Sequence, residues 1–183
     1  MREVTTRMRD QSADVEIERA ITVLVQSFEE SGDNPKPVVL HCIRVGMRLY
    51  KGGYDPKIVI SALLHDLLED TDVTTEEIAS QFGTEVAEIV AATSFDSNIE
   101  DDRERYRDMF ERCFNVGRAA VIVKAADILD NSRYYHRAES AELRMLLVEK
   151  MRYFIDNAEP FLHNEPLYHE LTEAYSTVQQ RIL

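Results

Sequence analysis

A histidine and several acidic side chains gather in the twelve residues SALLHDLLEDTD (61–72). Imidazole nitrogens and carboxylate oxygens are the groups that bind divalent metal ions and move protons. If the segment is an α-helix, with about 100° per residue, one side of it, roughly 140° wide, carries the four polar residues His65, Asp66, Glu69 and Asp70. The same pattern is also typical of a solvent-facing acidic surface. The segment alone therefore leaves two interpretations open, a chemical site and a solvated face.

Two residues elsewhere in the chain could supply ligands that one helix cannot. His41 lies in the apolar run PVVLHCIRV (37–45), and Asp127 lies in VIVKAADILDN (121–131). A lone histidine on an apolar helix is most often a hydrogen-bonded core residue. An aspartate in such a run is harder to explain, because an unpaired buried carboxylate costs on the order of several kcal/mol. We therefore expect His41, the pair His65–Asp66 and Asp127 to converge.

The elements that must position these residues are predicted to be helices. Apolar residues recur at helical spacing, and glycine, proline and cap residues mark the ends of the segments. Helices are expected over 14–30, 37–50, 56–72, 74–83, 84–92, 105–114, 118–131, 140–157 and 166–182. The polar stretch 94–104 is predicted to be a loop that could act as a lid, and 160–164 a turn. The sequence thus predicts an all-α fold, a bundle of about eight to ten helices.

Composition limits the classes of protein that remain. The chain has 183 residues, of which 44% are hydrophobic, and this suits one globular domain over 1–183. Lys plus Arg total 21 against 34 Asp plus Glu, and the formal net charge of −13 argues against a nucleic-acid polymer as partner. No apolar run suits a membrane span or a secretory signal, so we expect a cytoplasmic protein without membrane contact. Cys42 and Cys113 are expected to be reduced and buried.

Taken together, these motifs resemble the HD-domain metal-dependent phosphohydrolases, and most closely the guanosine polyphosphate (ppGpp) pyrophosphohydrolase domain of RelA/SpoT-type enzymes. The likeness is carried by ALLHDLLEDTDVTTEEIASQFGTEVAEIV (62–90) and VKAADILDN (123–131). An HDxxED motif coupled to a downstream KxADxxxN is a specific signal. The resemblance implies a single HD-type domain, with its core motifs over 37–134 and C-terminal helices over 140–183.

Residue by residue, the resemblance implies one divalent ion bound by four ligands, His41, His65, Asp66 and Asp127. Two imidazoles and two carboxylates favour Mn²⁺, with Fe²⁺ or Zn²⁺ as alternatives. Such an ion would lower the pKa of a bound water and polarise a phosphoryl oxygen. Glu69 and Asp70 resemble the catalytic acidic pair of the family, which orients or deprotonates the attacking water. Asn131 is expected to contact the substrate, although asparagine at this position also suits a helix C-cap.

The chain departs from the family just before His41. Alarmone hydrolases carry a basic Arg-Lys-Ser-Gly segment followed by Pro-Tyr there, whereas this chain has ESGDNP (30–35) and a single basic residue, Lys36. We therefore expect either poor hydrolysis of guanosine tetraphosphate or the recruitment of other cations to bind its phosphates, the candidates being Arg44, Lys124 and Arg133. Tyr106 is a candidate for stacking on a nucleotide base.

These features predict a metal-dependent phosphohydrolase whose partner is a small phosphorylated nucleotide, with guanosine 3′,5′-bispyrophosphate as the candidate substrate and no predicted oligomeric state. One alternative is an HD-family nucleoside monophosphate phosphatase. Another is a non-catalytic helical binding module that keeps the metal for stability. The pair Glu69–Asp70 counts against the binding module, because a structural metal needs no acids that act on water.

Overall fold

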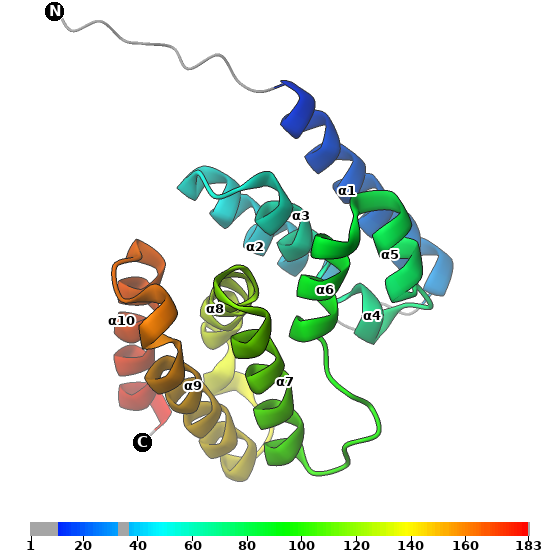
Figure 1. Cartoon of the computed structure of the whole chain (residues 1–183). Coiled ribbons are helices and arrows are strands. Elements are labelled where there is room, and N and C mark those ends of the chain that lie inside the picture. The colour runs from blue at the N-terminus through cyan, green and yellow to red at the C-terminus, as the bar shows by residue number, and fades with distance from the viewer. Residues whose placement is uncertain (1–10, 33–36, 183) are drawn as a thin grey trace, which may run out of the picture.

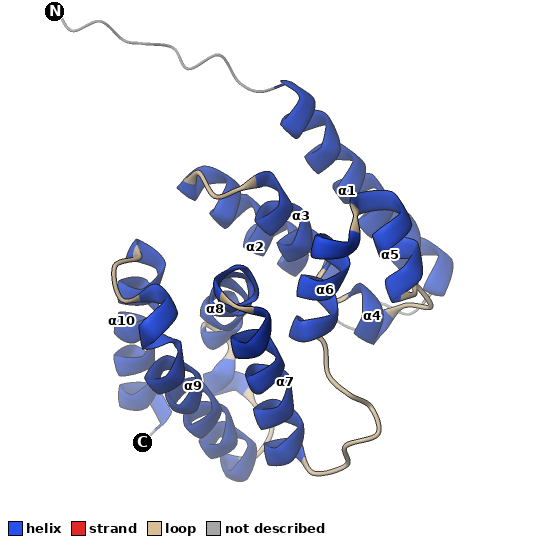
Figure 2. Cartoon of the chain, viewed as in Figure 1, coloured by secondary structure: helices blue, strands red, loops and turns tan. Residues whose placement is uncertain are grey.

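The computed structural model describes residues 11–32 and 37–182, and every regular element in this part of the chain is helical (Figures 1 and 2). The predicted all-α fold is confirmed. In chain order the elements are α1 (Gln11–Ser31), α2 (Val38–Gly52), α3 (Pro56–Leu64), α4 (Leu67–Asp70), α5 (Thr75–Phe82), α6 (Thr84–Thr93), α7 (Asp102–Val116), α8 (Arg118–Ser132), the 3-10 helix η1 (Tyr135–Arg137), α9 (Ala141–Leu162) and α10 (Pro166–Ile182). Within the described ranges, no helix is both long enough and apolar enough to cross a membrane.

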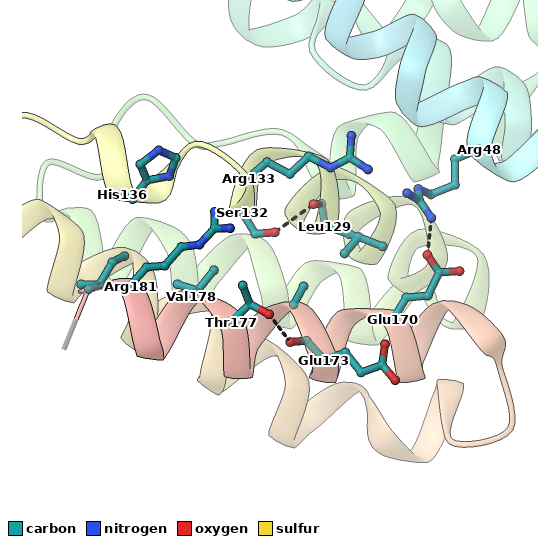
Figure 3. Close-up of a pocket in the computed structure, with 12 residues that line it drawn as sticks. Arg48, Leu129, Ser132, Arg133, His136, Glu170, Glu173, Thr177, Val178 and Arg181 are labelled. Carbon is teal, nitrogen blue, oxygen red and sulfur yellow. Dashed lines mark hydrogen bonds and ion pairs between the residues drawn. The ribbon is translucent and has the colours of Figure 1, made fainter.

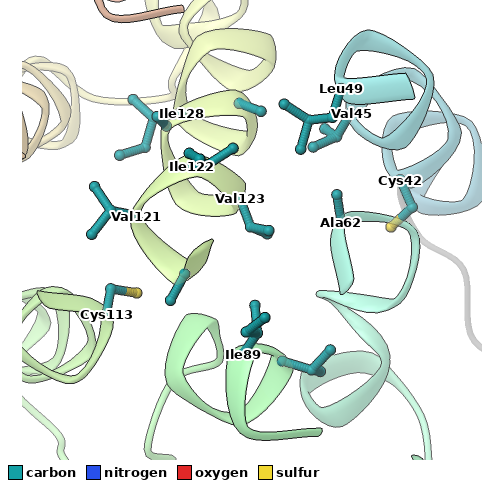
Figure 4. Close-up of a cluster of buried hydrophobic side chains, with 14 of the residues drawn as sticks. Cys42, Val45, Leu49, Ala62, Ile89, Cys113, Val121, Ile122, Val123 and Ile128 are labelled. Carbon is teal, nitrogen blue, oxygen red and sulfur yellow. The ribbon is translucent and has the colours of Figure 1, made fainter. Parts of the chain in front are cut away.

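Helix α8 lies at the centre of the bundle and carries part of the predicted site. Helices α2, α3, α6, α7, α9 and α10 all pack against it. Nearly all of its residues are buried, including the charged residues Lys124, Asp127 and Asp130. Figure 4 shows its apolar side chains between those of α2, α3, α6 and α7, with Cys42 and Cys113 in the same core, buried as expected. The helix predicted over 118–131 is therefore an inner helix of the bundle.

Cap residues set several helix ends as the sequence predicts. The Asp55 carboxylate accepts a hydrogen bond from the backbone N–H of Lys57 at 2.9 Å and starts α3. In the capping box of α5, the N–H of Glu77 donates to Thr74 Oγ1 at 3.2 Å, and the N–H of Thr74 donates to the Glu77 carboxylate at 2.8 Å. Gly83 lets α6 follow α5 directly, because its φ of +92° suits glycine alone.

The prediction of one continuous helix over 56–72 is wrong, because the helix breaks at His65 and Asp66. The carbonyl oxygen of His65 accepts a hydrogen bond from the Ser94 hydroxyl at 3.3 Å. In a continuous helix that carbonyl would bond the N–H of Glu69, which here donates to the Asp66 carbonyl at 3.2 Å. The polar residues expected on one helix face are therefore divided between the break and the short helix α4.

Helix α7 begins three residues earlier than the sequence predicts, at Asp102. The Asp101 carboxylate accepts a hydrogen bond from the N–H of Glu104 at 2.9 Å and caps the helix there. The predicted loop over 94–104 is shorter as a result.

Helix α9 continues through Pro160 to Leu162, where the sequence predicts a turn over 160–164. Proline removes the donor that would bond the carbonyl of Asp156, but both residues are exposed, so water can bond that carbonyl. Leu162 is fully buried. Its burial favours one more helical turn beyond the proline.

Candidate metal centre

Three side chains from three elements meet beside α8. His41 comes from α2, His65 from the break between α3 and α4, and Asp127 from α8. His41 Nε2 lies 3.3 Å from His65 Nε2 and 3.3 Å from Asp127 Oδ1. The distance from His65 Nε2 to Asp127 Oδ1 is 3.7 Å. Their ligand atoms all lie within 4.8 Å of one another, so these residues converge as expected and could hold a metal ion.

Asp66 lies at the edge of the same cluster. One carboxylate oxygen is 3.1 Å from His65 Nε2 and the other is 3.8 Å from His41 Nε2. The Cys42 thiol donates a hydrogen bond to Asp66 Oδ2 at 3.6 Å. Burial and this neighbouring carboxylate raise the pKa of Cys42 well above its usual value, so the thiol stays protonated. All four residues predicted as ligands are therefore neighbours.

The outer nitrogens of both histidine rings are occupied, which turns the inner nitrogens toward each other. His65 Nδ1 lies 2.8 Å from the carbonyl oxygen of Ala62. His41 Nδ1 lies 2.8 Å from Asp130 Oδ2. A ring that donates from Nδ1 presents the lone pair of Nε2, so two lone pairs and the surrounding carboxylates point at one place. Such a set of donors fits a divalent cation and requires either that cation or protons.

Protons fill this role in the metal-free protein. Burial alone would lower the pKa of His41, but the Asp127 and Asp130 carboxylates outweigh it and raise the pKa to about 10. Burial likewise opposes the charge of His65, yet the carboxylates of Asp66 and Asp127 raise its pKa. A metal ion would have to displace these protons.

Asp130 supports the cluster and was not predicted as a site residue. Besides His41, it binds the Arg44 guanidinium, with Nε donating to Oδ1 at 3.0 Å and Nη2 to Oδ2 at 2.6 Å. Burial would raise the pKa of Asp130, but hydrogen bonds from His41 and Arg44 hold it well below the usual range. Asp130 could have been predicted from the sequence, because it is a second carboxylate in the same apolar run as Asp127. It follows Asp127 by three residues, so the two lie side by side on the helix surface.

Lys124 and Asn131, two residues predicted to contact substrate, both bind Asp127. Lys124 Nζ donates to Asp127 Oδ2 at 2.9 Å, and Asn131 Nδ2 donates to Oδ1 at 2.6 Å. Burial would raise the pKa of Asp127, but Lys124 and the two histidines hold it well below the usual range. These contacts fix the orientation of the carboxylate. A role of Lys124 or Asn131 toward substrate stays a prediction.

Arg44 and Arg133 also have defined places. Arg44 is committed to Asp130. The Arg133 side chain is 56% exposed, lies 3.9 Å from Asp130 Oδ1 and lines a separate cavity. These cations were proposed to replace the basic segment that the chain lacks just before His41. Residues 33–36 of that segment, including Lys36, lie outside the described part of the chain.

The predicted catalytic acids, Glu69 and Asp70, lie next to each other on α4, and both reach solvent. Glu69 Oε1 accepts a hydrogen bond from the backbone N–H of Phe95 at 2.8 Å. Burial raises the pKa of Glu69, Lys124 acts against this, and Asp66 adds to it. Asp70 is the exposed last residue of α4. Glu69 thus interacts electrostatically with Lys124 and Asp66 of the cluster.

Lys150 of α9 is a further functional candidate that the sequence reasoning missed. Its ammonium lies 3.8 Å from the centre of the Tyr106 ring, 5.8 Å from that of Phe95 and 5.9 Å from that of Phe110. Burial and the charge of Lys124 lower the pKa of Lys150 to about 7, while the cluster carboxylates act in the opposite direction. The signal for it was spacing, since Lys150 continues the apolar face of α9 at helical positions 147, 150, 151 and 154.

Tyr106 was predicted to stack on a nucleotide base, and in the structure its ring contacts Phe95 and Lys150. Its ring meets that of Phe95 edge to face, with the centres 5.0 Å apart, and supports Lys150. Tyr106 therefore helps to form an aromatic cage around a cation.

An all-helical bundle with two histidines and several carboxylates turned toward one point defines a class of helical proteins with an internal metal-binding cluster. Within that class, the chain belongs to the HD domain family, whose pattern matches residues 20–154.

Known proteins with related sequences share one activity. The guanosine-3′,5′-bis(diphosphate) 3′-pyrophosphohydrolase of Aquifex aeolicus is 34% identical over 120 residues, a match that covers 63% of this chain and 17% of that protein. The MESH1 enzyme of Danio rerio, with the same activity in its name, is 39% identical over 103 residues, which cover 55% of this chain and 57% of that one. The match thus spans little more than half of one relative and under a fifth of the other.

A solved structure extends the likeness over nearly the whole chain. It is described as a metazoan ortholog of SpoT that hydrolyzes ppGpp and plays a role in starvation responses. It superposes with a TM-score of 0.76 at 26% identity, over 92% of this chain and 97% of that one.

Proposed function

We propose that this chain is a metal-dependent pyrophosphohydrolase that removes the 3′-pyrophosphate of guanosine 3′,5′-bispyrophosphate. The observation that carries the proposal is the pair of imidazole Nε2 atoms 3.3 Å apart within a ring of carboxylates. A cation is needed there, and a phosphorylated substrate needs the same cation to offset its charge. The activity of the relatives supports the choice of substrate.

The proposed ligands of the ion are His41, His65, Asp66 and Asp127. Imidazoles combined with carboxylates suit Mn²⁺, with Fe²⁺ and Zn²⁺ as alternatives. When bound, the ion supplies a Lewis acid that makes a water more acidic and polarises a phosphoryl oxygen. Asp130 and the Ala62 carbonyl keep the two rings turned toward the ion, and Lys124 and Asn131 orient Asp127.

Glu69 is the proposed general base. A general base works best when its pKa lies near the operating pH, because it is then still ionised and accepts a proton readily. The raised pKa of Glu69 brings it closer to that condition. It takes a proton from the attacking water as the new P–O bond forms and the bond to the ribose 3′ oxygen breaks, and that oxygen leaves with the electron pair and takes up a proton from solvent. The N–H of Phe95 fixes one of its oxygens. Asp70, the neighbouring acid, is proposed to assist in orienting the water.

Lys150 is the proposed contact for substrate phosphates. Arg44 and Lys124 each form an ion pair with a carboxylate, whereas no such pair is present for Lys150 within the described residues. An ammonium held by aromatic rings within reach of the cluster charges lacks a compensating anion, and a phosphate group would supply one. Asn131, Arg44 and Arg133 remain weaker candidates for substrate contacts.

The test combines metal content with turnover. Protein loaded with Mn²⁺ should release pyrophosphate from guanosine 3′,5′-bispyrophosphate, and Asp66→Ala should lose both the ion and the activity. Asp72→Ala is the matched control, because Asp72 is an exposed acid of the same segment. Full activity after removal of the metal by a chelator would overturn the proposal.

A nucleoside monophosphate phosphatase is the second candidate, favoured by the absence of the family's basic segment from residues 30–36. It predicts release of phosphate from nucleoside monophosphates in the same assay and no turnover of the bispyrophosphate. A protein that keeps its metal and turns over neither substrate would instead be a binding module.

A further inference from the structure

A cavity of about 380 Å³ lies away from the metal centre, between α8, η1, α10 and the end of α2 (Figure 3). Leu129 and Ser132 line it from α8, whereas Asp127 and Asn131 of the same helix face the cluster. The volume falls in the range of sites for small molecules. The metal centre therefore does not account for this cavity.

Basic side chains dominate the polar part of the lining. Arg133, His136 and Arg181 border the cavity, and Figure 3 shows Arg133 and His136 on the side of α8 and η1, with Arg181 reaching in from α10. The nearest ion-pair partner of Arg133 is Asp130 at 3.9 Å. Among the described residues, neither His136 nor Arg181 has an ion-pair partner. A cluster of basic side chains is notable in this chain, because it has 34 acidic and only 21 basic residues.

The acidic residues of the lining do not neutralise these groups. Glu170 forms an ion pair with Arg48 at one end of the cavity. The Glu173 carboxylate points away from Arg133 and Arg181 in Figure 3. An excess of positive charge is therefore left in the lining, carried by Arg133 and Arg181.

The remaining lining is mostly apolar, with the hydroxyl groups of Ser132 and Thr177 among it. Leu129 and Val178 are almost fully buried, at 6% and 5% exposure, and Ala174 and Ile182 complete this surface. The hydroxyl groups present are already used, since Ser132 donates to the carbonyl of Leu129 at 2.9 Å within its own helix. The cavity thus offers cations and an apolar surface.

We propose that this cavity is a second binding site, for a small organic phosphate such as a nucleoside monophosphate. One arginine guanidinium can donate two parallel hydrogen bonds to two phosphate oxygens. Arg133 and Arg181 would therefore bind the phosphate. The apolar surface from α8 and α10 would pack against the planar base. The proposal does not depend on the function proposed for the metal centre.

Site-resolved NMR of the full-length, ¹⁵N-labelled protein loaded with Zn²⁺ tests this site. Titration with guanosine monophosphate should shift the amide signals of 132–136 and 177–182, with a Kd below about 1 mM, separately from any shift of 41 and 65–70. Inorganic phosphate should shift the same signals but bind more weakly, because it lacks a base. Guanosine without phosphate should leave them unchanged.

Variants locate the anion. Arg133→Gln and Arg181→Gln should each weaken binding of guanosine monophosphate at this cavity by about tenfold or more. Arg152→Gln should leave it unchanged, because Arg152 is an exposed arginine of α9 with its own partner, Asp156. All three changes are on the surface, and the remaining amide signals report on folding. Shifts confined to the metal centre, equal shifts with guanosine or sodium chloride, or wild-type binding by both cavity variants would overturn the proposal.

Discussion

Asp130 controls the metal centre without being one of its proposed ligands. It accepts a hydrogen bond from His41 and binds Arg44, so it fixes both the tautomer and the direction of the ring. Asp130→Asn should lower metal affinity by about tenfold to a hundredfold, and excess Mn²⁺ should restore most of the activity. Competition with a fluorescent chelator measures the affinity.

The matched control for Asp130→Asn is Asp108→Asn, an aspartate of α7 that pairs with Arg112 at the surface. It should bind metal as the wild type does. Unchanged affinity in Asp130→Asn would mean that helix packing alone orients His41.

Lys150 should lower the free energy of unfolding of the protein while it strengthens substrate binding. Replacing it by methionine keeps the length of the side chain and removes a charge that is costly to bury, so Lys150→Met should raise the free energy of unfolding by about 2 kcal/mol, roughly 4–8 °C in Tm. It should also raise KM for the bispyrophosphate by about tenfold to a hundredfold. Calorimetry and steady-state kinetics measure the two effects.

The control for Lys150→Met is Lys57→Met, which removes an exposed lysine paired with Glu85. It should change neither quantity. A lower Tm with unchanged KM would show that Lys150 is a structural cation held by the aromatic rings.

The pH dependence of stability separates Lys150 from His41 in the metal-free protein. The pKa of His41 is raised from 6.5 to about 10, so its stabilisation is complete below pH 6.5 and is lost as the pH rises through 10. The pKa of Lys150 is lowered from 10.5 to about 7, so its contribution rises with pH over 7 to 10.5. The two trends oppose each other between about pH 7 and 10.

In that window, stability should therefore fall more steeply with pH in Lys150→Met than in the wild type, by up to about 1.4 kcal/mol per pH unit. Urea unfolding at several pH values measures the difference. Parallel curves for the two proteins would contradict the lowered pKa of Lys150.

The break between α3 and α4 positions His65, and the Ser94 hydroxyl stabilises it by bonding the His65 carbonyl. Ser94→Ala leaves that buried carbonyl without this donor. Unfolding free energy should fall by about 1–2 kcal/mol, and metal affinity should fall with it because His65 is held less firmly. Denaturant unfolding and metal titration test the two parts.

Ser80→Ala is the control, because the Ser80 hydroxyl bonds the Glu77 carbonyl on an exposed helix. Reduced stability with unchanged metal affinity in Ser94→Ala would mean that the break forms without the hydroxyl.

Much of the fold was predictable because its signals are local. Caps such as Asp55 and the pair Thr74–Glu77 bond within three residues, so their sequence spacing gives the helix starts. The break at His65 was not predictable, because the group that bonds its carbonyl, Ser94, lies 29 residues away.

The same distinction applies to the site. His41, His65, Asp66 and Asp127 were predicted from polar residues in apolar runs and from the family resemblance, and they meet. Arg44 was expected to bind substrate, but its partner Asp130 lies 86 residues away in the sequence. Lys150 was not singled out from the sequence, because only the fold shows that Tyr106 and Phe95 surround it. Pairings across the bundle need the fold itself.

The net charge of the whole molecule should oppose a polyanionic substrate. At −13, the long-range field repels the bispyrophosphate at low salt, whereas the short-range contacts at the metal centre are less exposed to screening. Raising sodium chloride from about 20 to 150 mM should therefore increase kcat/KM by roughly two- to fivefold. Guanosine monophosphate, with less charge, should show a smaller rise. A steady fall would mean that local cations guide the substrate from a distance.

Because the imidazoles of His41 and His65 face each other, a metal ion that binds between them must replace protons. With the pKa of His41 raised to about 10, the metal-free cluster carries a proton at neutral pH, and each entering ion must expel it. Loading should acidify an unbuffered solution, and the apparent affinity should fall about tenfold for each pH unit of acidification below 10. The heat of loading should also vary with the ionisation enthalpy of the buffer. Protons thus act as competing ligands, and mild acidification would empty the centre before it unfolds the protein.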